Sequence, residues 1–109
     1  MISSTGTVKT PHAESYLLRL CKHFSKKITI EYGENIASAH FPFGYCRSIA
    51  QDQQVLLFYC EAEDLTKLEQ LQSVIEHHVG MFTRQNPLVV TWSDRLEIET
   101  NDRNITNKL

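Results

Sequence analysis

Three side chains in this sequence have the clearest capacity for chemistry: His23, Cys46 and His78. Imidazole and thiolate groups bind transition metals, and together they can also act as a base and a nucleophile. Lys22 and Lys26 flank His23 on a predicted helix, and their positive charge favours the neutral imidazole, which is the metal-binding form. The alternative for His23 is a solvated helix histidine with no further role.

Helical spacing places His78 on the buried side of a second predicted helix, three residues after Ile75 and four before Phe82. A histidine there usually donates a hydrogen bond to a backbone carbonyl and packs against the core; the alternative is a ligand or a base. Cys46 and Arg47 are consecutive residues of a predicted strand, so their side chains point to opposite faces of the sheet. Cys46 is either a small buried residue or a thiolate that Arg47 or a nearby histidine favours.

A closed zinc site made of Cys21, His23, His40 and Cys46 does not fit helix geometry. Cys21 and His23 are two residues apart and therefore lie about 200° apart around a helix axis, so they cannot face one metal ion. The close cysteine pairs of structural zinc motifs are also absent. No cofactor is assigned, and iron or another metal stays open as a ligand.

Enzyme signatures are weak. The sequence has no Gly-x-Ser-x-Gly elbow and no glycine loop for phosphate binding. We therefore name no catalytic residue. The alternative is a small thiol-dependent enzyme that uses Cys46 as nucleophile and His23 or His78 as base.

Hydrophobic periodicity predicts the elements that must position these side chains. A helix starts at Pro11 with Thr10 as its N-cap, and a second helix covers 64–82 with Asp64 as its cap. Alternating or apolar segments predict strands at 5–10, 28–32, 36–41, 45–50, 55–60 and 88–92, with a further short strand near Leu96 and Ile98. Phe41 to Gly44 is predicted to be a hairpin turn.

This order predicts an α+β two-layer sandwich with one antiparallel sheet and both helices on one face. Its β-α-β4-α-β topology is similar to that of TATA-binding-protein-like units. The segment 55–60 is apolar on both faces, so we expect a central strand that is covered on both sides. Residues 1–100 are expected to form one domain, and 101–109 a flexible tail.

The sheet face without helices is the second candidate site, because it needs a ligand, a partner or a second copy. Aromatic side chains and arginine are typical of interfaces. The candidates for this open surface are Tyr32, His40, Tyr45, Arg47, Tyr59 and Trp92. A well-solvated sheet face is the alternative.

Composition excludes several classes of protein. The formal net charge of −2 argues against a dedicated nucleic-acid binder, which usually has a basic surplus. No apolar segment approaches the length that spans a membrane, and the start of the sequence lacks an apolar signal region. Three cysteines do not suggest a disulfide framework. We expect a cytoplasmic protein with no membrane partner.

Four segments together resemble the bacterial domain-of-unknown-function 2218 family: YLLRLCKHFSKK, HFPFGYC, LQSVIEHHVGMF and LVVTW. The resemblance extends to Trp92. Lys26 and Met81 depart from it, since the family often has a histidine and an arginine there. The residues that match the family pattern are Leu20, His23, Lys27, Phe41, Gly44, Cys46, His78, Phe82 and Trp92.

The resemblance implies no established activity. Domains of this family occur alone or beside siderophore-interacting, ferric-reductase-like proteins, which implies an accessory role in iron–siderophore handling and a partner of that kind. The first hypothesis is thus a binding or accessory module, with the open sheet face as the surface for a homodimer. Its expected ligand-binding residues are His23, Cys46, His78, Lys27, Arg47 and Trp92.

The last alternative is a nucleic-acid-binding module. It would use the basic residues Arg19, Lys22, Lys26, Lys27 and Arg47. Most of these lie near the end of the first predicted helix, where the helix dipole alone favours positive charge, so this hypothesis ranks last.

Overall fold

Seven strands and two helices are present in the computed structural model, which describes residues 1–82, 88–93 and 96–97. Their order agrees with the predicted one, including the short final strand that was expected near Leu96. In chain order the elements are β1 (Ile2–Lys9), α1 (Ala13–Phe24), β2 (Thr29–Gly33), β3 (Ile36–Phe41), β4 (Gly44–Gln51), β5 (Val55–Ala62), α2 (Leu65–Gly80), β6 (Thr91–Trp92) and β7 (Leu96–Glu97).

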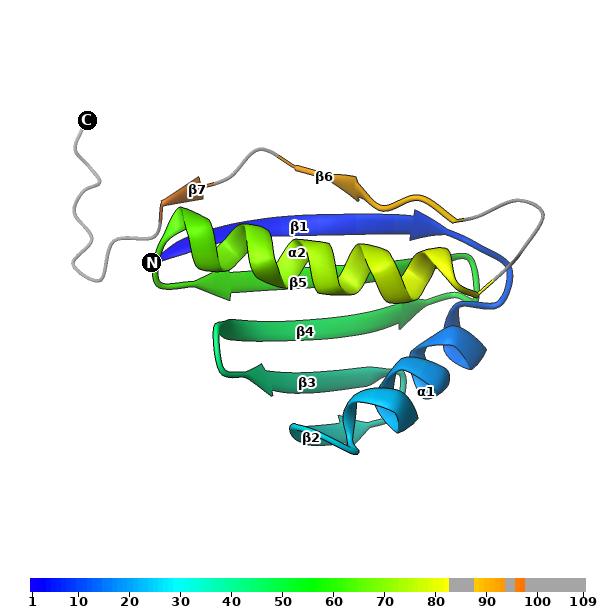
Figure 1. Cartoon of the computed structure of the whole chain (residues 1–109). Coiled ribbons are helices and arrows are strands. Elements are labelled where there is room, and N and C mark those ends of the chain that lie inside the picture. The colour runs from blue at the N-terminus through cyan, green and yellow to red at the C-terminus, as the bar shows by residue number, and fades with distance from the viewer. Residues whose placement is uncertain (83–87, 94–95, 98–109) are drawn as a thin grey trace.

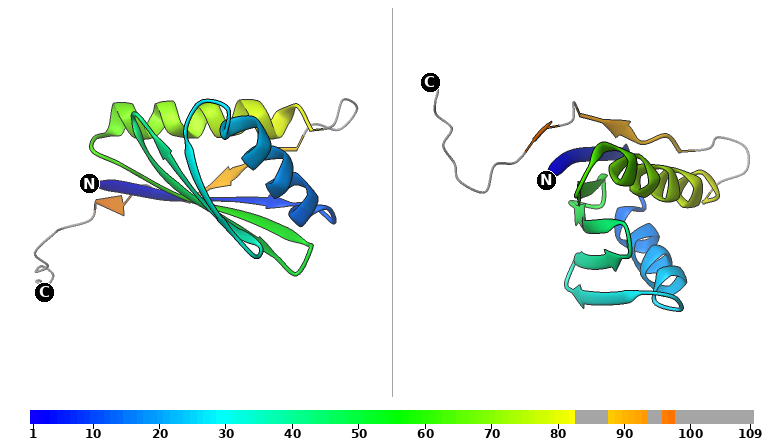
Figure 2. Two further views of the ribbon diagram at one scale, coloured as in Figure 1. Left: turned by 90° about the horizontal axis from the view of Figure 1, so that it is seen from below. Right: turned by 60° about the vertical axis from the view of Figure 1, so that its left-hand side comes forward.

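The strands form one antiparallel sheet in the order β2-β3-β4-β5-β1-β6, and β7 also pairs with β1. Both helices lie on the same face of this twisted sheet (Figures 1 and 2). The α1 helix crosses the β2–β4 side, and α2 runs along β5 and β1. The predicted α+β two-layer sandwich is confirmed.

The strand β5 shows how the core is made. Leu56, Phe58 and Cys60 point to the helix layer and are at most 1% exposed, while Leu57 and Tyr59 between them are half-buried on the other face. The strand is central, as its apolar sequence predicted, because it lies between β4 and β1. The prediction that both of its faces are covered is wrong, since both helices lie on one side.

The α1 helix begins later than the sequence predicted. Pro11 and His12 form a turn, and the helix starts at Ala13. Thr10 still satisfies a backbone donor, because its Oγ1 accepts a hydrogen bond from the backbone N–H of His12 at 3.1 Å. The buried stripe of α1 contains Ala13, Tyr16, Leu17 and Leu20.

The predicted cap of α2 is confirmed. The Asp64 side chain accepts a hydrogen bond from the backbone N–H of Lys67 at 2.9 Å, which satisfies one of the free donors of the first turn. The buried side of α2 consists of Leu68, Leu71, Gln72, Ile75 and Val79. Phe82 lies just beyond the helix and is half-buried.

The chain beyond α2 forms less sheet than predicted. Only Thr91 and Trp92 of the segment 88–92 pair with β1. Ile98, Pro87 and the predicted flexible tail at 101–109 lie outside the described residues. Within the part of the chain that the structure describes, no helix has the length and apolarity needed to cross a membrane.

Candidate functional site

The structure brings two of the predicted site residues together across the helix layer. His23 lies near the end of α1 and His78 near the end of α2, 55 positions apart in the sequence. Their Nε2 atoms are 2.9 Å apart and their ring centroids 4.4 Å apart. The two imidazoles therefore share a hydrogen bond between the helices.

The backbone of α2 determines which nitrogen of His78 carries its proton. Nδ1 of His78 lies 2.8 Å from the carbonyl oxygen of Val74, one helical turn earlier, and a carbonyl can only accept. Nδ1 therefore donates, which confirms the predicted hydrogen bond from His78 to a backbone carbonyl. In the neutral ring, Nε2 is then an acceptor with its lone pair toward His23.

Phe24 packs against both rings of the histidine pair, and a second aromatic pair lies nearby. The Phe24 ring meets His78 edge-on, with the centroids 4.8 Å apart. Tyr16 and Phe82 stack at 4.5 Å, and the Arg19 guanidinium lies 5.0 Å from the centre of the Phe82 ring. The contact with Phe24 and the hydrogen bond to Val74 restrict the ring of His78, while His23 stays exposed.

Local electrostatics favour the neutral form of His23. Partial desolvation lowers the pKa of His23, and the positive charges of His78, Lys26 and Lys27 lower it further. The predicted effect of the neighbouring lysines is confirmed for Lys26. Neutral His23 can therefore offer a lone pair near neutral pH. Lys27 itself is exposed, just past the end of α1.

Two surface hollows meet at His78. One has a volume of about 170 Å³ and is lined by Arg19, Leu20, His23, His78, Met81 and Phe82. The other, of about 700 Å³, is wider and is lined mainly by α2 residues from Thr66 to His78, together with Phe43. We call the first hollow, with its six lining residues, the histidine groove.

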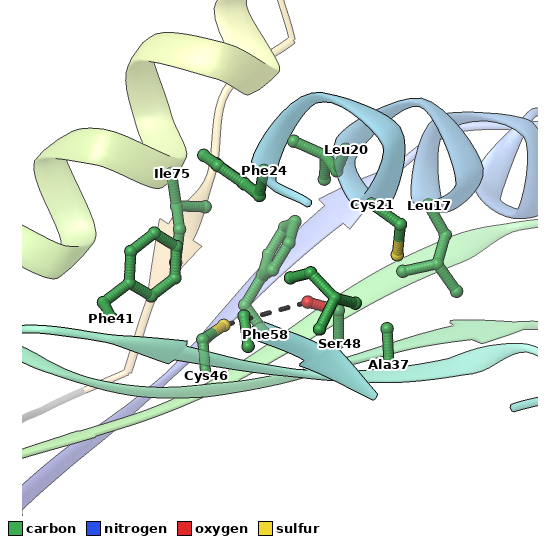
Figure 3. Close-up of a pocket in the computed structure, with 12 residues that line it drawn as sticks. Leu17, Leu20, Cys21, Phe24, Ala37, Phe41, Cys46, Ser48, Phe58 and Ile75 are labelled. Atoms are coloured by element: carbon green, nitrogen blue, oxygen red, sulfur yellow. Dashed lines mark hydrogen bonds between the residues drawn. The ribbon is translucent and has the colours of Figure 1, made fainter. Parts of the chain in front are cut away.

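Cys46 lies apart from this groove, in the core beneath α1. It is 2% exposed, and its Sγ lies 3.7 Å from Sγ of Cys60 and 3.8 Å from Oγ of Ser48. Figure 3 shows the thiols of Cys46 and Cys21 pointing into the small space between α1 and the sheet. This cavity has a volume of about 20 Å³, which is enough for one water molecule and too small for a ligand.

Arg47 is exposed on the opposite, open face of the sheet. Its Nε donates a hydrogen bond to Oη of Tyr45 at 3.4 Å, which raises the pKa of Arg47. Tyr45 also shares a 3.0 Å hydrogen bond with Ser38. Tyr59, paired with Arg47 across the strands, donates to Glu61 at 3.1 Å; desolvation and this bond raise the pKa of Tyr59.

Trp92 and Tyr32 do not lie on the open face, so that part of the prediction is wrong. Register places Trp92 opposite Gly6, on the helix side, and its Nε1 donates to Oε2 of Glu76 in α2 at 2.7 Å. Tyr32 pairs with Ala37, whose side chain is in the core. Each one-residue change of register moves a side chain to the other face.

The basic residues proposed for nucleic-acid binding do not form one surface. Arg19, Lys22 and Lys26 belong to α1 or its end, in the helix layer, whereas Arg47 is on the open face of the sheet. The sheet therefore separates them.

Two features of the histidine groove were not predicted from the sequence. Arg19 was assigned only to nucleic acid, and its position beside Phe82 was not foreseen. The pairing of Tyr16 with Phe82 was also missed. The i, i+4 spacing of Val74 and His78 was a usable signal for the carbonyl bond, but no local signal brings α1 and α2 together.

Comparisons with known proteins identify a bacterial family and a similar solved structure. Residues 5–93 match the model of a family described as uncharacterized protein conserved in bacteria, DUF2218. The chain is similar to the NMR structure of PA4090 from Pseudomonas aeruginosa, with 27% identity and a TM-score of 0.74; the match covers 85% of this chain and 96% of that one. The comparison with curated proteins gave no match.

Proposed function

The chain belongs to the DUF2218 family of uncharacterised bacterial proteins, and on that premise we propose that it is a non-enzymatic binding or accessory domain whose ligand site is the histidine groove. The observation that supports this most directly is the 2.9 Å approach of His23 and His78 from two different helices. Two imidazoles and an arginine line this hollow together with the apolar side chains of Leu20, Met81 and Phe82, a mixture that is typical of ligand sites.

The expected biological setting is iron–siderophore metabolism in the cytoplasm, with a siderophore-interacting, ferric-reductase-like protein as partner. This setting is what the resemblance of the sequence to the family implies. The positive charge of Arg19, Lys26 and Lys27 around the groove agrees with an anionic ligand.

Catalysis by Cys46 is the weaker alternative. A nucleophilic thiol must be reachable by substrate and within hydrogen-bond distance of its base. Cys46 is 2% exposed, and its contacts are the side chains of Ser48 and Cys60. This environment is typical of a buried packing cysteine.

The open sheet face is the proposed surface for a second copy of the chain. One row of this face contains Ile36, Ile49 and Leu57, directly paired across β3, β4 and β5 and all half-buried. The next row contains Arg47, and the row after that contains Glu61. A face with an aliphatic row and both signs of charge can complement itself across a two-fold axis.

Titration of the ¹⁵N-labelled domain with the anionic Ga³⁺ complex of enterobactin tests the ligand site. Ga³⁺ replaces Fe³⁺ without broadening the NMR signals, and the complex leaves no coordination position open. We expect saturable shifts at Leu20, His23, His78 and Phe82, and none at Tyr45 on the open face. His78→Gln should weaken the shifts, and His77→Gln is the matched control. Shifts absent from the groove would overturn the proposed site for this ligand class.

A further inference from the structure

The separation of the two histidine rings fits metal coordination as well as it fits a hydrogen bond. Two imidazoles that bind one ion at right angles, through bonds of about 2.0–2.1 Å, have nitrogens about 2.9 Å apart and ring centres about 4.5 Å apart. The observed separations are 2.9 Å and 4.4 Å. His23 and His78 therefore already have the spacing of two adjacent ligands in an octahedral or square-planar site.

The hydrogen bond from His78 to Val74 is the second observation. Metal-binding histidines usually donate their other ring N–H to a carbonyl or carboxylate, which fixes the tautomer and the orientation of the ring. Nδ1 of His78 makes such a bond, at 2.8 Å to the carbonyl oxygen of Val74. Nε2 of His78 is thus held ready to accept either a proton or a metal ion.

The described part of the chain supplies two ligands at this point, His23 and His78. Among the described residues, no group of three or more His, Cys, Asp or Glu side chains could hold a metal ion. An ion bound here would need its remaining ligands from another molecule, and the histidine groove, of about 170 Å³, offers room for part of one. A bare cation would also meet the positive charge of Arg19, Lys26 and Lys27.

We propose that Nε2 of His23 and Nε2 of His78 bind a first-row transition metal ion that arrives inside an anionic chelate with two adjacent coordination positions open. This inference rests on the proposed function, because it names the ligand class of the same groove. The carboxylates or other anionic groups of the chelator face the basic side chains, and the two imidazoles complete the coordination of the metal.

Binding is an exchange of ligands with no electron transfer. The two nitrogen lone pairs displace two water molecules from the metal, and the proton on Nε2 of neutral His23 moves to Nδ1 of the same ring. His23 is exposed, so solvent can assist this transfer. His78 keeps its Nδ1 proton and its bond to Val74.

The Ni²⁺ complex of nitrilotriacetate is a suitable probe, since this anionic chelate leaves two adjacent positions open. Calorimetric titration of the untagged chain should show one complex bound per chain. His23→Gln and His78→Gln should each weaken binding at least about tenfold, since one imidazole cannot use both positions. His77→Gln is the matched control and should bind as the wild type does. Thermal unfolding checks that each variant is folded.

The Ni²⁺ complex of EDTA, whose positions are filled, should not bind. Wild-type affinity in both His23→Gln and His78→Gln, or equal binding of the EDTA complex, would overturn the inference. Changing Lys26 and Lys27 to Gln together should weaken binding and reduce its salt dependence. Binding of Ga³⁺–enterobactin without the nitrilotriacetate complex would retain the proposed function and reject metal ligation. Binding of the nitrilotriacetate complex without the siderophore complex would retain metal ligation by the two histidines and reject the siderophore setting.

Discussion

The three thiols of this chain differ in their surroundings more than in their sequence context. Cys46 and Cys60 are cross-strand partners on β4 and β5, both at most 2% exposed, with their sulfur atoms 3.7 Å apart. Cys21 is only partly buried in α1, and burial raises its pKa. The hydrogen bond to Cys46 and desolvation raise the pKa of Cys60 far above its ordinary value.

Stability should therefore fall at alkaline pH, and Cys60 should account for part of the loss. The unfolded thiol ionises near its ordinary pKa of 9.0, while the folded thiol keeps its proton. The folded state then binds more protons, so the free energy of unfolding decreases as pH rises, by about 1–2 kcal/mol between pH 8 and pH 10. Urea unfolding at several pH values measures this loss. In Cys60→Ala, the free energy of unfolding should fall less steeply with pH, by a slope that corresponds to about one proton. An unchanged slope would contradict the assignment to Cys60.

At the scale of elements, the β3–β4 hairpin fixes how the sheet approaches α2. Pro42 and Phe43 form the two-residue connection, as the sequence predicted, and Gly44 begins β4. A Cβ at Gly44 would lie 2.8 Å from the carbonyl oxygen of Glu61 and 3.1 Å from Cδ2 of Leu71. Only glycine lets this end of β4 lie so close to β5 and the helix.

Gly44→Ala should therefore destabilise the fold by about 1–3 kcal/mol, the usual cost of overpacking, because the contacted carbonyl belongs to the backbone and cannot move aside. Gly80→Ala is the matched control. Gly80 ends α2, and a Cβ added there would have no neighbouring atom within 4 Å, so alanine should stabilise by about 0.5–1 kcal/mol. Urea unfolding of both variants measures the two effects. Equal stability of Gly44→Ala and the wild type would show that the hairpin relaxes easily.

At the scale of the whole molecule, the sandwich has two unequal faces. The helices bury one side of the sheet, including Leu56, Phe58 and Cys60. The other side remains without a covering layer among the described residues, although its aliphatic row is half-buried by neighbouring strands. A domain of this shape has one face available for a large contact, and the histidine groove lies on the other.

Sedimentation equilibrium of the wild-type chain should show a dimer formed through the open face. Ile49→Arg should weaken the dimer at least about tenfold, because Ile49 is at the centre of the aliphatic row, between Ile36 and Leu57. Leu18→Arg is the matched control, since Leu18 is 44% exposed on α1, in the helix layer, and should leave the dimer intact. A wild-type chain that stays monomeric at about 100 μM would overturn the proposal of a dimer through the open face.

The order and type of the elements could be predicted from the sequence because their signals are local. Alternation marks β3, the i, i+4 stripe marks α1, and the Asp64 side chain marks the start of α2. The tautomer of His78 was also predictable, since Val74 is one turn earlier on the same helix. These features depend on residues within a few positions of one another.

Only the tertiary structure decided which distant side chains meet. His23 and His78 form a pair because two helices that are independent in the sequence cross the same face of one sheet. Trp92 faces α2 rather than the open side because the register of β6 on β1 places it opposite Gly6. Alternation shows that a strand has two faces, but the face toward the core depends on pairing with residues far away in the chain.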